Sequence, residues 1–207
     1  MRWLMAMTMM LCAAGEAAAK SKQIKAGEHA GVVVLVNGGA TIQNGAKKTP
    51  AKAGMSLIGG DTVVTGEAGK VKLLLDDDST INLGSNTKFL LEAVKVDLSG
   101  ERQVSLKILS GKFMAAVSTW FGSKSSWEVT TPTAVAGVRG TVLWGDTKLD
   151  AICALHGQIE VKSLTGSGPV ELAAGDCATK MGEGKTDPLK PTPEQVAAYL
   201  SEVLAKR

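Results

Sequence analysis

The chain has 207 residues, of which 44% are hydrophobic and 21% are charged, a composition typical of a globular domain and not of a disordered segment. Its formal net charge is only +3, and aromatic residues make up 4%. These values exclude the concentrated basic, aromatic-rich surface of a nucleic-acid-binding protein.

The first residues have the features of a secretory signal peptide. Arg2 supplies a short positive region, and residues 3–14 form an apolar run that is too short to span a bilayer. Small residues up to Ala19 predict cleavage after that residue, so residues 1–19 are expected to be removed and the protein to be periplasmic or secreted. An uncleaved anchor is the alternative. Residues 20–30 are polar and basic and predict a flexible N-terminal arm.

Residues 31–181 have the pattern of a β domain. Short runs of alternating apolar and polar residues are separated by glycine-rich turns at regular spacing. Residues 31–43 and 71–83 each predict a β-hairpin. We therefore expect an all-β fold, an antiparallel β-sandwich or β-roll of many short strands. Residues 32–54 resemble residues 151–176, which suggests that the first and last β units are built alike and pack together.

The C-terminal part changes character. Residues 182–192 predict a proline-containing linker, and residues 193–206 predict an amphipathic α-helix. Thr192 and Gln195 have the spacing of a capping box at the start of this helix. Its apolar stripe, which includes Val196 and Val203, either docks on the β domain or faces a partner.

Residue patterns that carry catalysis or bind metals are not found in the sequence. His29 and His156 are the two histidines and belong to no metal-binding spacing, and no serine-nucleophile motif occurs. We therefore predict that the protein is not an enzyme and uses no cofactor or metal. Residues 76–79 (DDDS) have the oxygen ligands that calcium prefers, but they lack the spacing of a dedicated calcium loop and favour a turn.

Trp120 and Phe121 lie beside a glycine-serine turn and are the candidate surface for contact with a partner. The alternative is that both side chains fold inward and belong to the core.

Five separated motifs resemble the FecR domain family. In chain order they are GDTVVT at residues 60–65, the hairpin around DDDST, ILSGKF, TPTAVAGVRGT at residues 131–141, and HGQIEV. The resemblance extends over residues 54–181. It implies that the matching positions form a family motif with a structural role, namely Gly60, Asp61, Thr65, Thr131, Pro132, Arg139, Gly140 and Thr141. Asp78 stands where the family often has glycine, and aspartate tolerates the left-handed backbone that such a turn needs.

The resemblance also implies a function. Family members that regulate iron uptake are membrane-spanning sensors with a cytoplasmic part that binds a sigma factor, and we expect this chain to correspond to the exported portion alone. We expect a non-enzymatic FecR-like domain that mediates protein or cell-envelope contacts in Gram-negative bacteria. A periplasmic sensory or regulatory accessory that works with a membrane partner is the alternative. The expected partner is an envelope protein or a cell-wall component, and no transmembrane segment is expected once the signal is removed.

Cys153 and Cys177 are an even pair once the signal peptide is removed. They form either a disulfide or two buried thiols. Their strands, one before the HG turn and one after AAGD, are expected to be neighbours in the last sheet, which favours the disulfide.

Arg139 has three interpretations: a ligand-binding, a catalytic or a structural residue. Alternation from Ala134 onward places Arg139 and Thr141 on one face of a strand. We favour a buried structural role, in which the guanidinium pairs with backbone carbonyls or with an acid such as Asp61.

Overall fold

The protein is described by a computed structural model that covers residues 22–23, 29–96, 102–118, 125–166, 168–184 and 187–205. The predicted signal peptide, residues 1–19, and the candidate contact residues Trp120 and Phe121 lie outside the described residues. Within the described ranges, no helix is long and apolar enough to cross a membrane.

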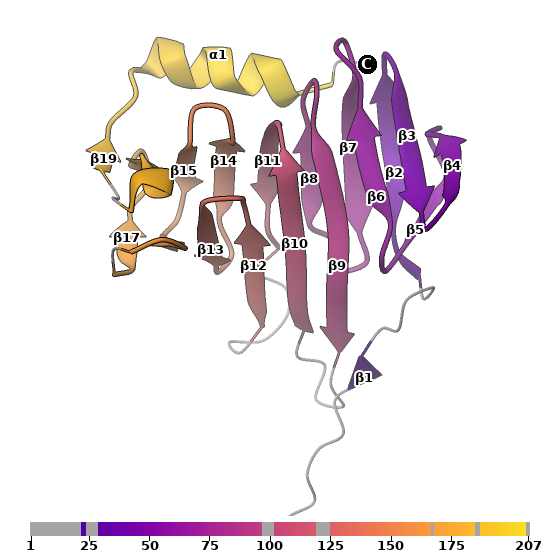
Figure 1. Cartoon of the computed structure of the whole chain (residues 1–207), viewed down its shortest axis with the longest axis horizontal. Coiled ribbons are helices and arrows are strands. Elements are labelled where there is room, and N and C mark those ends of the chain that lie inside the picture. Colours follow the sequence, from indigo (N-terminus) through magenta and orange to yellow (C-terminus); the bar gives the residue numbers. More distant parts are fainter. Residues whose placement is uncertain are drawn as a thin grey trace, which may run out of the picture.

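Two large β-sheets pack face to face, and the chain runs back and forth between them (Figure 1). Sheet 1 consists of β1 (Lys22–Gln23), β3 (Ala40–Asn44), β4 (Lys47–Pro50), β6 (Thr62–Thr65), β9 (Lys88–Val96), β10 (Arg102–Ser110), β12 (Ser126–Thr130), β13 (Ala134–Val138), β16 (Ile159–Ser163) and β17 (Val170–Leu172). Sheet 2 consists of β2 (His29–Asn37), β5 (Ser56–Ile58), β7 (Lys70–Leu75), β8 (Thr80–Leu83), β11 (Lys112–Ala116), β14 (Val142–Asp146), β15 (Ala151–His156), β18 (Cys177–Thr179) and β19 (Asp187–Leu189). A 3-10 turn, η1 (Met181–Glu183), and one helix, α1 (Pro193–Val203), complete the described elements.

Strand order in both sheets nearly follows chain order, from β4 and β5 at one end to β17 and β19 at the other. Neighbouring strands are antiparallel except for β10 and β12, which run parallel. The predicted all-β sandwich or roll with a C-terminal helix is confirmed. The first and last β units lie at opposite ends of the sandwich, so the expectation that they pack together is wrong.

The core lies between the sheets because the strands alternate as the period-2 rule requires. In β7, Val71, Leu73 and Leu75 are buried, while the residues that alternate with them, Lys70, Lys72 and Leu74, are half-buried. Two large aromatic side chains of this core, Phe89 from sheet 1 and Phe113 from sheet 2, are at most 1% exposed. Burial of each such side chain contributes about 2–3 kcal/mol.

Glycine-rich turns in this chain mostly carry it from one sheet to the other and do not close hairpins. The described crossings contain Gly38, Gly54, Gly60, Gly66, Gly84, Gly111, Gly140, Gly157 and Gly175. The hairpin predicted for residues 31–43 is therefore wrong, because β2 belongs to sheet 2 and β3 to sheet 1. The hairpin predicted for residues 71–83 is confirmed by the pairing of β7 with β8. A strand–glycine–strand pattern is common to hairpins and to corners between packed sheets, so the pattern alone does not separate them.

The predicted element boundaries need two corrections. The β domain begins at His29, inside the segment predicted as an arm, and Lys22–Gln23 pairs with β9. The segment predicted as a linker contains β19, which pairs with β18 although it includes Pro188. Proline is tolerated there because β19 is an edge strand. At a position where the backbone nitrogen faces solvent, the sheet needs no N–H donor.

Helix α1 starts as predicted and docks on its own domain (Figure 1). Thr192 and Gln195 form the capping box. The Tyr199 ring stacks on Trp144 of β14 with ring centroids 4.2 Å apart, and Val203 is fully buried. These residues belong to a second, smaller apolar cluster on the outer face of sheet 2. The apolar stripe therefore packs on the β domain.

The disulfide between Cys153 and Cys177 lies beneath α1, within that second apolar cluster. The two residues are directly opposite each other on β15 and β18, with Cα atoms 3.9 Å apart. The adjacent hydrogen bond from the Ala154 N–H to the Asp176 carbonyl marks them as a non-hydrogen-bonded pair, the register in which antiparallel residues come closest. The predicted disulfide is confirmed.

Candidate functional site: a mixed-charge groove on sheet 1

Asp61 is buried at the turn into β6 and already has its hydrogen bonds. One carboxylate oxygen accepts from the Asn44 amide at 2.8 Å and the other from the Ile58 N–H at 2.9 Å. Gly60 precedes it with φ 92°, in the left-handed region that favours glycine. A smaller pocket borders Asp61, but the Asp61 carboxylate already accepts hydrogen bonds from Asn44 and Ile58.

Thr65 and Thr131 also bind the backbone around them. The Thr65 hydroxyl donates to the Gly84 carbonyl at 2.6 Å and accepts from the Thr87 N–H at 2.8 Å. The Thr131 hydroxyl accepts from the Ala134 N–H at 3.0 Å and closes the turn between β12 and β13, where Pro132 is exposed. The contacts of both threonines are thus contacts within the fold.

Arg139 is exposed, which overturns the expectation of a buried strut paired with Asp61. The chain leaves β13 after Val138, and Gly140 adopts φ 60° and redirects it to β14 of sheet 2. Alternation therefore does not continue through the motif. Thr141 is buried, with its methyl group against Gly157 and its hydroxyl without a hydrogen-bond partner among the described residues.

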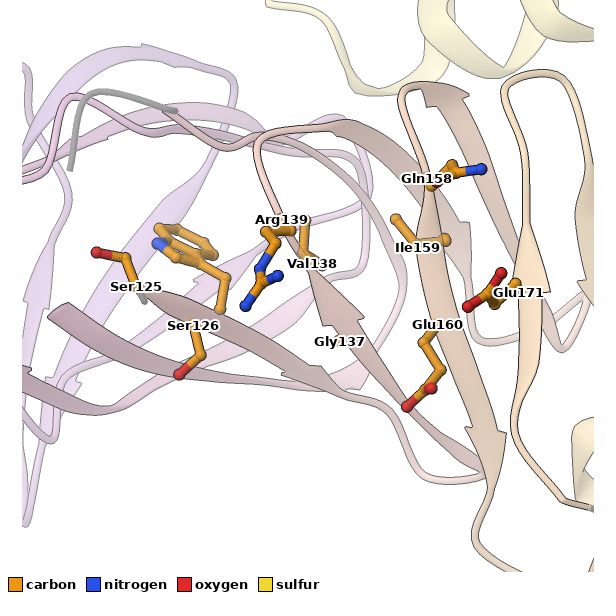
Figure 2. Close-up of a pocket in the computed structure, with 10 residues that line it drawn as sticks. Ser125, Ser126, Gly137, Val138, Arg139, Gln158, Ile159, Glu160 and Glu171 are labelled. Atoms are coloured by element: carbon orange, nitrogen blue, oxygen red, sulfur yellow. The ribbon is translucent and has the colours of Figure 1, made fainter. Parts of the chain in front are cut away.

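Arg139 opens onto a groove of about 480 Å³ on sheet 1 (Figure 2). The walls and floor come from β12, β13, β16 and the edge strand β17. The lining residues are Ser125, Ser126, Trp127, Gly137, Val138, Arg139, Gln158, Ile159, Glu160 and Glu171.

Two exposed rows of residues cross the groove. In the first, Ser126, Arg139 and Gln158 lie beside the buried row Trp127–Val138–Ile159. In the second, strand register places Gly137 opposite Glu160, and Glu160 opposite Glu171. A row of hydrogen-bond donors with one cation therefore faces a row with two carboxylates in the groove, and a third, Glu128, lies opposite Gly137 on β12 outside the groove lining.

The oppositely charged side chains of the groove do not form ion pairs with one another. Among the described residues, no ion pair or side-chain hydrogen bond engages Arg139, Glu160 or Glu171. Figure 2 shows the arginine at the end of β13 and the two glutamates on β16 and β17, with Gly137 between Arg139 and Glu160. All three charges are thus available to a ligand.

Trp127 lines the groove and also belongs to the core between the sheets. Its indole N–H donates to the buried carboxylate of Asp77 at 2.8 Å, and Asp77 also accepts from the Ser79 hydroxyl at 2.9 Å. Residues 76–79 form a turn in which Asp78 has φ 64°, as expected from its glycine-like position. In the part of the chain that the structure describes, no group of three or more His, Cys, Asp or Glu residues is arranged to hold a metal ion.

Arg139 was the one groove residue that the sequence pointed to. Glu160, Glu171 and Gln158 come from strands far along the chain, and only the register of four strands brings them together. The unusual glycine of β13, Gly137, was the one local signal that could have marked the place.

The comparisons with known proteins agree with this architecture. The family model described as "FecR protein" matches residues 61–167, more than half of the chain. No curated protein matches the sequence. Two crystal structures of a candidate anti-sigma factor from Parabacteroides distasonis ATCC 8503, at 2.50 Å and 1.65 Å resolution, are similar in fold.

Both structures superpose with a TM-score of 0.54 at 14% sequence identity. The match covers 67% of this chain and 63% or 64% of the other. The chain thus spans less than two thirds of the length of those structures, and the likeness shows the fold.

Proposed function

Because the chain belongs to the FecR family, we propose that it is a non-enzymatic FecR-type domain that works in the cell envelope by binding a protein or a cell-wall component. The exposure of Arg139 carries this proposal. The other charged residue of the family motif, Asp61, is buried and bonded within the fold, whereas Arg139 faces an open groove. A charge that the fold does not use is available for recognition.

A regulatory role is the second candidate, and the solved structures of similar fold favour it because their protein is described as a candidate anti-sigma factor. In this version the chain is a sensory accessory, and a membrane partner passes its ligand state to the cytoplasm. The two candidates share the binding surface and differ in whether transcription responds.

Export is part of the proposal. The disulfide supports it, since disulfides persist in oxidising compartments outside the cytoplasm. We propose cleavage after Ala19, a β domain up to residue 181, and a C-terminal segment that ends in α1. An intact mass that starts at Lys20 is the expected result for protein recovered from the periplasm, and a retained N-terminus would contradict the cleavage.

Site-specific photo-crosslinking in the native bacterium tests the binding surface. A photoreactive residue at Gln158, in the groove, is compared with one at Glu67, an exposed residue near the opposite end of the sandwich. We expect a defined crosslinked species from position 158 alone. Equal products from both positions, or none from position 158, would exclude the groove as the contact surface.

Deletion of the gene separates the two candidates. A regulatory accessory predicts a changed set of transcripts that is restored by the wild-type chain and not by Arg139→Ala. A purely structural or adhesive role predicts an unchanged transcript profile together with the same crosslink.

A further inference from the structure

We propose that the groove binds a short peptide in its zwitterionic form, with the peptide carboxylate on Arg139 and its ammonium group between Glu160 and Glu171. Nothing in this inference depends on the regulatory role. It concerns binding by the purified chain, so its failure would leave the proposed function standing.

The spacing of the two rows sets the size of the ligand. On β12, Ser126 of the first row and Glu128, which lies opposite Gly137, are two residues apart, which separates the rows by about 7 Å at the strand rise of 3.3 Å per residue. Two extended residues of a peptide span about the same distance. Glu160 and Glu171 also lie one and two strands to the side of Arg139, at about 5 Å per strand, so the two charges of the ligand must be about one row apart or more. A dipeptide meets this requirement, whereas a single amino acid holds both charges too close together.

The carboxylate end of such a peptide has its donors in place. The Arg139 guanidinium offers a planar pair of N–H groups that matches a carboxylate. Ser126 and Gln158 are exposed in the same row and add a hydroxyl and an amide. This row contains no carboxylate that would repel the ligand.

The ammonium group of the peptide is attracted by two neighbouring negative charges of the protein. Glu160 and Glu171 are directly opposite each other on β16 and β17, and both are exposed. Like charges at directly opposed positions destabilise a sheet, and no cation of the described chain bridges them. An ammonium ion held between them removes this repulsion.

Gly137 keeps the groove open, and the fold does not require a glycine there. Its backbone is outside the left-handed region, and an added Cβ would meet only the Glu160 carbonyl oxygen at an ordinary 3.9 Å. Glycine inside a strand costs stability and often marks a place where a ligand approaches. Any side chain at this position would stand between Arg139 and Glu160.

Titrations of residues 20–207, which include every described residue, test the proposal by NMR with isotope-labelled protein. The probe is alanyl-alanine. The controls are N-acetyl-alanyl-alanine, which lacks the ammonium group, alanyl-alanine amide, which lacks the carboxylate, and alanine. We expect saturable shifts of groove amides with the dipeptide, and affinities at least about tenfold weaker with each control, as the loss of one charged hydrogen bond implies.

Three variants complete the test. Gly137→Val is expected to fold with an equal or higher Tm, since valine favours strands, and to lose binding because it fills the groove. Glu171→Gln is expected to weaken binding about tenfold, the cost of one charged contact, whereas Glu67→Gln is expected to change nothing.

Two results would overturn the proposal. One is a lack of saturation with alanyl-alanine up to about 10 mM, because three charged contacts predict tighter binding than that. The other is unchanged binding by a folded Gly137→Val variant. If Gly137→Val does not fold, unchanged binding by Glu171→Gln overturns the proposal in its place.

Discussion

Asp77 and Asp78 are adjacent in the chain, but the two aspartates have different structural roles. Asp77 is 4% exposed and accepts hydrogen bonds from Trp127 and Ser79. Asp78 is exposed and tolerates a left-handed backbone. We expect Asp77→Ala to lower stability by about 2 kcal/mol, because the buried indole N–H would lose its acceptor. This corresponds to a fall in Tm of roughly 6 °C for a domain of this size.

Asp78→Gly is the matched control, one residue away. Because glycine adopts the same backbone without strain, we expect a change in the free energy of unfolding of at most about 0.5 kcal/mol. Thermal unfolding followed by circular dichroism measures both variants. Equal losses in the two would mean that the turn as a whole, and not the bond from Trp127, is what matters.

Residue-scale prediction failed at Arg139 for a definite reason. Alternation assumes a continuous strand, and Gly140 ends that strand and sends the chain to the other sheet. The strand therefore does not reach Thr141, which is buried, and the expectation that Arg139 and Thr141 share one face is wrong. Thr192 and Gln195 were predictable because a capping box depends on residues three positions apart and on nothing distant.

At the scale of elements, α1 is a helix of 11 residues that depends on its docking. Helices this short are marginal alone in water. Val203 is fully buried against the second apolar cluster, so Val203→Ala removes two methyl groups from the contact. We expect a loss of about 2 kcal/mol, confined to the helix.

Hydrogen exchange measures this directly. Amides of α1 should exchange faster in Val203→Ala, while those of β9 and β10 should keep their protection. Ala197→Gln changes an exposed position of the same helix and should leave the exchange unaltered. Faster exchange throughout the sandwich would contradict a local role for the contact.

Element types were predictable, but their partners were not. The alternation in β7 and β8 gave two strands and their hairpin, since the DDDS turn is local. The apolar run from Val32 to Val36 looks the same whether the following glycine closes a hairpin or turns a corner. Pairing of β2 with β5 and β7 depends on the stacking of the whole sandwich.

For the whole molecule, the disulfide ties β15 to β18 across a sequence separation of 24 residues. Closing a loop of this length restricts the unfolded chain by about 3 kcal/mol. We expect the double variant Cys153→Ala, Cys177→Ala to lose about that much stability, with a fall in Tm of roughly 10 °C. Two alkylatable thiols in the unreduced wild-type protein would contradict the bond itself.

The all-β class and the family were predictable because five motifs occur in order along the chain. The groove was not predictable, because it exists only where β12, β13, β16 and β17 come into register. Recognition by such a surface is a property of the assembled sheet and of no single motif.

The melting temperature of Arg139→Ala, measured beside wild type, tests most directly whether the arginine of the family motif serves binding and not the fold. Since the side chain is exposed and has no partner among the described residues, we predict a Tm within about 2 °C of wild type. A fall of about 6 °C or more, as large as that expected for Asp77→Ala, would show that Arg139 holds the sandwich together and would contradict the account.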